Sequence, residues 1–164
     1  MPKFVVDNHI GIDLDKTGAV GEFQVGTTML TNEGGLIEYV KALSEISTYA
    51  AVLIYNDGTA QMVTTTLAND AGSGKKVGFA QVSIASAYYG WVYRMGNNLK
   101  IKLSDDCADN VPLFTTATAG ELDDATVSNC LVLGAILPVT ASVATALTCI
   151  VGTPSIIAPY TNPA

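Results

Sequence analysis

The sequence predicts an all-β protein, a small barrel or sandwich of short antiparallel strands with extended N- and C-terminal arms. Runs of alternating or β-branched residues recur about every 10–12 residues, which is the spacing typical of barrels and sandwiches. The composition is rich in Gly, Ala, Thr and Val, and only 14% of the residues are charged. Long amphipathic helices need more Glu, Lys, Leu and Arg than this chain provides. These observations favour strands and tight turns over helices.

The expected elements follow one another from residue 23 onwards. Residues 36–46 are ambiguous, because their apolar positions fit one helical face while 36–42 also alternates as a strand. We predict a strand to Lys41 and then a single helical turn over 44–46. Asn56-Asp57-Gly58 predicts a hairpin, because its glycine supplies the positive φ of a tight turn. The expected strands are 23–30, 36–41, 48–55, 59–66, 77–85, 86–96, 98–104, 111–116, 129–137 and 146–152, with a turn at Gly96–Asn98 and a polar loop at 68–76.

Three regions are expected: an N-terminal arm and turn region (1–22), a β domain (23–152) and a C-terminal extended arm (153–164). The last region contains three prolines, which block regular strand ladders and favour an extended arm. The stretch 130–151 is long and uncharged, but its Pro138, small residues and threonines indicate two buried strands around a turn. We therefore expect no membrane partner.

The charges are distributed unevenly along the chain. The net charge is −7, which disfavours binding to nucleic acid, and every charged residue lies at or before Asp124. A forty-residue segment without charge must be buried in its own core, against another subunit, or both. We expect Ile156, Ile157 and Tyr160 to contact a neighbouring chain. The candidate interface residues, in the core or against a subunit or partner, are Phe4, Val5, Val6, Tyr89, Trp91, Tyr93, Ile156, Ile157 and Tyr160.

The only tryptophan lies in the aromatic stretch 86–96. On an extended backbone Tyr89, Trp91 and Tyr93 share one face. Such a row could stack on sugar rings, or it could fill a core or a subunit interface. A sugar site needs hydrogen-bond donors beside its ring, and Arg94 lies on the opposite face. Core or interface is therefore the favoured interpretation.

Residues for catalysis or metal binding are sparse. The chain has one histidine, His9, so any Ser-His-Asp or Cys-His arrangement would depend on it. Its three cysteines contain no CxxC pair and are expected to be small buried residues of a protein made in a reducing cytoplasm. The segment 13–24 begins like a calcium loop but ends in Gln24. The acidic clusters at 105–109 and 123–124 have turn-like surroundings. We expect no enzyme activity, no metal and no cofactor.

Several segments resemble a known family. GKKVGFAQVSIASAYYGWVYRMG (74–96), CADNVPLFTTATAGELDD (107–124) and CLVLGAILPVT (130–140) are similar to the capsid decoration, or cement, proteins of tailed bacteriophages. The resemblance spans roughly residues 25–152. It implies a virion structural protein that is made in the host cytoplasm and binds the outer surface of the phage head. Its partners would be the major capsid protein and copies of itself, as a homotrimer or dimer.

A second function stays open at this stage. A head-fibre or adhesin-type domain could hold host surface glycans through the aromatic row at Tyr89, Trp91 and Tyr93. This alternative predicts glycan binding that Trp91→Ala abolishes without loss of the fold.

Overall fold

The structure, a computed structural model, describes residues 11–71, 75–125, 130–143 and 145–157. Within these ranges it has ten strands and one short helix, which confirms the prediction of an all-β protein. The elements are β1 (Thr28–Leu30), β2 (Leu36–Ala42), β3 (Ala51–Ile54), β4 (Thr59–Met62), α1 (Thr65–Ala71), β5 (Lys76–Ala80), β6 (Tyr89–Lys102), β7 (Leu113–Thr115), β8 (Leu122–Asp123), β9 (Leu131–Ile136) and β10 (Ala146–Ile157).

Strands β2 to β6 close into a ring, called here the first ring. They pair in the order β2, β4, β3, β5, β6, and β6 pairs back with β2. The β2–β4 pair is parallel, and the other pairs are antiparallel. Small and β-branched side chains dominate the buried cluster of this ring, which suits a narrow barrel interior. The cluster contains Val40, Ala42, Ile46, Ala50, Val52, Ile54, Ala60, Ala80, Ile84 and Val92.

A buried carboxylate connects three strands of the first ring. Glu38 on β2 is 1% exposed, and its two oxygens bind Lys76 on β5 at 2.8 Å and Arg94 on β6 at 2.7 Å. An ionised carboxylate is costly to bury unless it is paired, and two cations pair it here. Because Glu38 and Val40 are two residues apart on one strand, they share a face. The ion triad therefore lies beside the apolar cluster of the ring.

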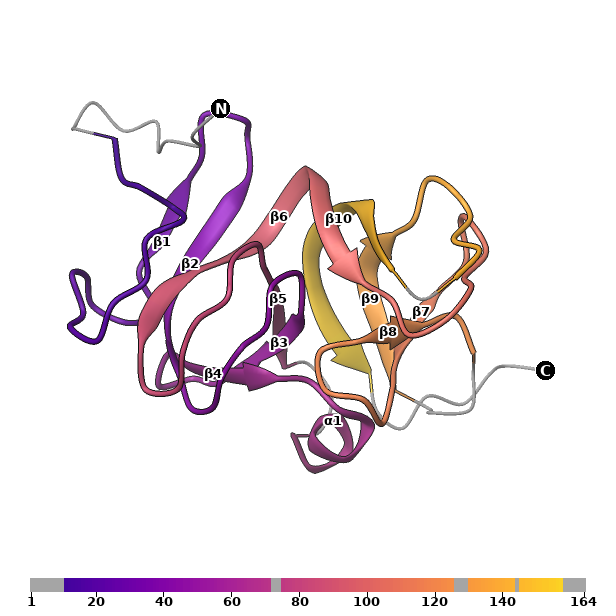
Figure 1. Cartoon of the computed structure of the whole chain (residues 1–164), viewed down its shortest axis with the longest axis horizontal. Coiled ribbons are helices and arrows are strands. Elements are labelled where there is room, and N and C mark those ends of the chain that lie inside the picture. The colour runs from indigo at the N-terminus through magenta and orange to yellow at the C-terminus, as the bar shows by residue number, and fades with distance from the viewer. Residues whose placement is uncertain (1–10, 72–74, 126–129, 144, 158–164) are drawn as a thin grey trace.

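Strand β6 continues beyond the first ring into a second one. There it pairs with β10, and the order continues through β9 and β7 to β8. A parallel bridge between Leu103 and Leu122 joins the residue after β6 to β8 and closes the second ring. Figure 1 shows the two rings side by side, with β6 and β10 between β1–β5 and β7–β9. The buried side chains of the second ring include Leu99, Ile101, Leu103, Leu113, Leu122, Val132, Ala135, Cys149, Val151 and Ile156.

The expected turn at Gly96–Asn98 is wrong, because β6 is one continuous strand of 14 residues. Asn98 has a φ of 62°, a conformation that asparagine tolerates better than most residues. The pairing with β10 shifts register at this point, between Cys149 and Val151. The unusual backbone conformation is therefore accommodated as an irregularity within the ladder, and the same strand serves both rings.

The start of the expected C-terminal arm is also wrong. Strand β10 runs through Pro154 to Ile157, and it pairs with β9 from Ile150 to Ile157. Pro154 lies where the register shifts, between Val151 and Ser155, so its missing N–H interrupts no regular ladder bond. Residues 153–157 thus belong to the sheet, while 158–164 lie outside the described residues.

Three shorter segments test the local predictions. The hairpin of β3 and β4 is confirmed, and Gly58 in its turn has a φ of 78°. The expected helical turn at 44–46 is wrong, because Ile46 instead forms a bridge with Ile84. Helix α1 replaces the end of an expected strand and the start of a loop. The hydroxyl of Thr64 accepts the Leu67 N–H and caps this helix.

Candidate interaction surface

The aromatic row of β6 lies inside the protein. Trp91 is 2% exposed and Tyr93 is 5% exposed, so the core interpretation is confirmed for both. The ring of Trp91 lies 4.8 Å from that of Tyr39 and 5.2 Å from that of Phe23, between centroids. Phe23 belongs to the chain before β1, which covers this face. Tyr89 is half-buried and stacks on Tyr39.

The hollow beside these rings is too small for a sugar. It is lined by Asp13, Lys16, Tyr39 and Trp91 among others, and its volume is about 20 Å³. A single water needs a cavity of roughly 10–15 Å³, whereas small-molecule sites measure roughly 300–1,000 Å³. The aromatic row therefore stabilises the fold and offers no platform for a glycan.

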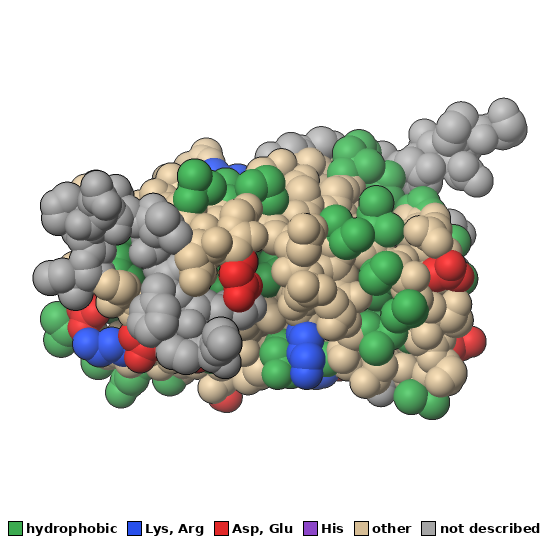
Figure 2. All heavy atoms as spheres, turned by 90° about the horizontal axis from the view of Figure 1, so that it is seen from above, with side chains coloured by type: hydrophobic (Ala, Val, Ile, Leu, Met, Phe, Trp, Pro, Cys, Tyr) green, Lys and Arg blue, Asp and Glu red, His purple; other side chains and the backbone are tan. Residues whose placement is uncertain are grey.

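A different surface, on β9 and β10, exposes large apolar side chains. Ile136 and Ile150 are direct cross-strand partners and are 47% and 48% exposed, and Leu133 on β9 is 44% exposed. The connection between the strands adds Val139 and Val143, which are more exposed still. These five residues are called the β9–β10 face. Figure 2 shows hydrophobic side chains gathered on the half of the molecule that holds these strands.

The β9–β10 face has no charge of its own, since no residue after Asp124 is charged. Singly exposed apolar residues are ordinary on a protein surface, but a group of them on uncharged strands indicates an interaction site. The face is also rigidly held, because the alternating side chains Val132, Ala135 and Val151 are buried in the second ring. Its geometry is thus fixed before any partner arrives.

An apolar groove runs along one edge of this face. Asn110, Val111 and Pro112 line one side of the groove, and Leu133, Gly134 and Ile136 line the other, so all but Asn110 of these are apolar. The groove measures about 290 Å³ and is open to solvent. Gly134 has a φ of 83°, and a side chain there would meet the Gly152 carbonyl oxygen at 2.6 Å. Only glycine permits this close approach of β9 and β10.

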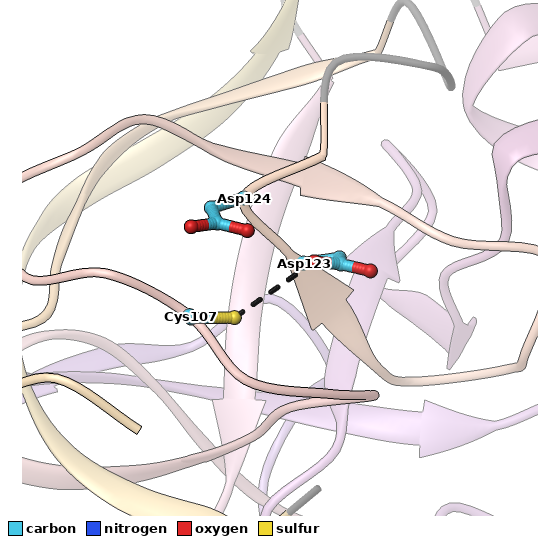
Figure 3. Close-up of side chains that lie close together, drawn as sticks. All are labelled: Cys107, Asp123 and Asp124. Carbon is cyan, nitrogen blue, oxygen red and sulfur yellow. Dashed lines mark hydrogen bonds between the residues drawn. The ribbon is translucent and has the colours of Figure 1, made fainter. Parts of the chain in front are cut away.

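Two acidic residues at the end of β8, Asp123 and Asp124, lie close to a cysteine. Oxygen and sulfur atoms of Cys107, Asp123 and Asp124 lie within 4.8 Å of one another (Figure 3). The Asp123 carboxylate accepts hydrogen bonds from Ser104 Oγ and from Ala125 N–H, and Asp124 accepts one from Ala108 N–H. The cluster therefore fastens two loops together.

The surroundings of the thiol in this cluster favour its protonated form. Burial raises the pKa of Cys107 to about 11, and the neighbouring carboxylates add to the shift. Thiolates, not thiols, act as nucleophiles and metal ligands. Cys130 and Cys149 are likewise buried and free, which confirms the prediction of three buried cysteines. Burial raises the pKa of both thiols, and that of Cys149 reaches about 12.

The remaining predicted interface residues are distributed differently from the expectation. The side chain of Ile156 is fully buried in the core of its own chain and offers no surface to a neighbouring one. Ile157 is half-buried and pairs with Leu131. Four residues, Phe4, Val5, Val6 and Tyr160, lie outside the described residues.

The exposed residues of the β9–β10 face were not predicted individually. The signal that could have found them is the alternation within the charge-free segment. On β9 and β10, buried Ala135, Cys149 and Val151 alternate with exposed Ile136 and Ile150.

Comparison with known proteins does not assign this chain to a family. No family model and no curated protein matches this chain. Among the described residues, no helix is long and apolar enough to cross a membrane.

Proposed function

We propose that this protein is a capsid decoration, or cement, protein that binds the outer surface of a bacteriophage head and stabilises the lattice of the major capsid protein. The proposal combines the resemblance of 74–96, 107–124 and 130–140 to that family with one structural observation. That observation is the β9–β10 face, an uncharged apolar surface held on a closed β ring. It belongs to the part of the chain that has no charge at all.

Such a face can supply the binding energy that cementing needs. Burying one exposed Leu or Ile side chain contributes up to about 1.5–3 kcal/mol, less the part that is already buried. The three strand residues of the face would thus contribute a few kcal/mol per copy. If copies associate, as a homotrimer or a dimer, simultaneous engagement of several shell subunits multiplies this modest affinity.

The charge on the first part of the chain suits a role on the outside of a particle. All of the net charge of −7 comes from residues before 125. A charged surface that faces water keeps a decorated particle soluble and repels nucleic acid. The protein would be made in the host cytoplasm and would act on the virion.

The two rival functions lack a matching site. A glycan-binding domain needs exposed ring faces, and Trp91 and Tyr93 lie in the core. A hydrolase that used the acidic clusters would need carboxyl groups free to transfer protons. Asp123 and Asp124, however, accept hydrogen bonds from loop N–H groups. We therefore propose neither an enzyme nor an adhesin.

The test is to mix the purified protein with undecorated phage capsids. We expect the protein to co-sediment with the capsids and to raise the temperature at which they open. Replacing Ile150 with lysine should weaken binding by about tenfold or more, because a charge would be desolvated in the contact. The matched control is Leu30→Lys, which changes an apolar residue on β1 that is somewhat more exposed than Ile150. Equal binding by both variants, or no co-sedimentation of the unaltered protein, would overturn the proposal.

A further inference from the structure

The two rings pair their first and last strands in the same way. In the first ring β2 pairs with β6, and the partners are Lys41 with Tyr89, Val40 with Gly90, Tyr39 with Trp91 and Glu38 with Val92. In the second ring the later part of β6 pairs with β10, and the partners are Lys102 with Ala146, Ile101 with Leu147, Lys100 with Thr148 and Leu99 with Cys149. Both ladders are antiparallel, and each has a register shift beyond the same end of these pairs. Each pair of one ladder therefore has a counterpart in the other.

The loops that follow these first strands also correspond. Each loop makes one antiparallel bridge and then contains a residue of positive φ. The bridges join Ile46 to Ile84 in the first ring and Cys107 to Ala141 in the second. The residues of positive φ, each three positions after a bridge residue, are Tyr49 at 65° and Asn110 at 57°. A positive φ is uncommon outside glycine, so its presence at the same place in both loops indicates one shared plan.

The remaining strands follow one another in the same order. Strand β4 corresponds to β8, because Leu53–Gln61 and Ile54–Ala60 of the first ring match Phe114–Asp123 and Thr115–Leu122 of the second. The parallel pair Ala42–Ala60 matches the parallel bridge Leu103–Leu122. Strands β5 and β6 pair at Phe79–Tyr93, and β9 and β10 pair at the matching Ile136–Ile150. The β7–β9 ladder is displaced in register relative to its counterpart, β3–β5.

The rings differ where the chain before β1 covers the first one. Phe23 packs there on Tyr39 and Trp91, whose counterparts in the second ring are the exposed Lys100 and the half-buried Thr148. Inside the rings the counterparts are all buried and apolar, as in Val40 and Ile101, or Val92 and Cys149. The side chains thus differ on the outer face, which is covered in one ring only, while the interior follows the same pattern in both.

We infer that the two rings are tandem repeats of one five-strand module and that each repeat unfolds as a cooperative unit of its own. Strand β6 is long because it is the last strand of one repeat and the first strand of the next. In proteins built from repeats, stability is approximately the sum of the repeats and of the contacts between them, so one repeat can open while its neighbour stays folded. The interior of the first ring forms a buried cluster separate from the one that fills the second. This inference does not depend on the proposed function.

The test is native-state hydrogen exchange of the full chain, with a buried residue truncated at matching positions of the two rings. Val52 on β3 and Leu113 on β7 are fully buried, and each lies three positions after the residue of positive φ in its loop. We expect Val52→Ala to speed the exchange of protected amides on β2 and β3 about tenfold or more, and of those on β7 and β9 less than about threefold. Leu113→Ala should have the opposite pattern. Strand β6 is left out of the comparison, because both rings contain it.

The unaltered protein provides a second measurement that does not require either variant to fold. In urea below the unfolding midpoint, the free energies of opening of amides on β2 and β3 should converge on one value and those on β7 and β9 on another. Two results would overturn the inference. One is a single common value for all four strands, and the other is equal acceleration of both rings by either variant. Each would mean that the two rings unfold together as one unit.

Discussion

The first ring and the second ring share β6 and are both filled mainly by aliphatic side chains, but they differ in the groups that surround this filling. The first ring is bounded by aromatic rings at Tyr39 and Trp91 and is fastened by the buried ion triad of Glu38. The second ring is filled by aliphatic side chains and thiols, and its strands β9 and β10 carry no charge. The apolar residues of β9 and β10 that do not point into the second ring are exposed on the β9–β10 face.

This difference separates stability from binding within one small protein. Substitutions in the first ring should destabilise the fold and affect a partner only through that loss. Substitutions on the outer face of the second ring should leave the fold intact and remove binding. The predictions below test this division, beginning with the largest expected effect.

Replacing Trp91 with alanine should reduce the free energy of unfolding by about 4 kcal/mol, as is typical of a buried aromatic truncated to a methyl group. The indole is 2% exposed and packs on Phe23 and Tyr39, so its removal leaves a cavity. Urea unfolding followed by circular dichroism measures the effect. The matched control is Tyr88→Ala, which truncates a neighbouring ring that is 39% exposed and should cost less than about 1 kcal/mol. Similar losses for the two variants would mean that Trp91 does not anchor the first ring.

Replacing Glu38 with alanine should cost about 3 kcal/mol, because Arg94 would stay buried without its carboxylate partner. Thermal unfolding at neutral pH measures the loss. The control is Glu22→Ala, which breaks an exposed pair with Lys16 and should cost less than about 1 kcal/mol. A loss below 1 kcal/mol for Glu38→Ala would contradict the view that the ion triad fastens the first ring.

The sequence predicts an element correctly where neighbouring residues determine its conformation. The prediction fails where pairing with a strand that is distant in the sequence determines it. The hairpin at Gly58 follows from its turn residues, and the burial of Trp91 follows from the sparse polar groups beside it. The continuity of β6 through Asn98 does not follow, since a strand with a positive φ persists only because β10 pairs on both sides of it. Strand β10 likewise continues past Pro154 because β9 pairs with it on both sides of that residue.

The β9–β10 face illustrates the same limit. The absence of charge after Asp124 predicts an adhesive segment, and this much is read from the sequence. Which side chains are exposed depends on the register between Ile136 and Ile150, which joins strands of one hairpin. The groove depends on Val111 and Pro112 lying opposite Leu133 and Ile136, which no local pattern encodes. The sequence therefore predicts the region that holds the candidate site. Only the folded structure shows which of its side chains are exposed and how they are arranged.

Replacing Gly134 with alanine tests whether the second ring fixes the face. The new methyl group would meet the Gly152 carbonyl at 2.6 Å on a backbone with a φ of 83°, so we expect a loss of about 2 kcal/mol. Gly152→Ala is the control, because an added methyl group there meets no atom within 4 Å. Both variants are measured by urea unfolding and by co-sedimentation with capsids. If Gly134→Ala unfolds like the unaltered protein, the strands can separate at this point and the groove is not a rigid feature.

The smallest effect is expected from the thiols of the second ring, in alkaline solution. Burial raises the pKa of Cys149 from an ordinary value of about 9 to about 12. Between these values the unfolded chain has lost the thiol proton while the folded chain retains it, so the free energy of unfolding falls as the pH rises. Cys149→Ala removes this contribution, and its stability should decline less steeply between pH 9 and pH 11 than that of the unaltered protein. Urea midpoints at several pH values measure the two slopes, and the lysines and tyrosines common to both proteins cancel in the difference. Parallel slopes would show that the thiol is hydrated in the folded state and that the interior of the second ring is less tightly closed than its strand pairing indicates.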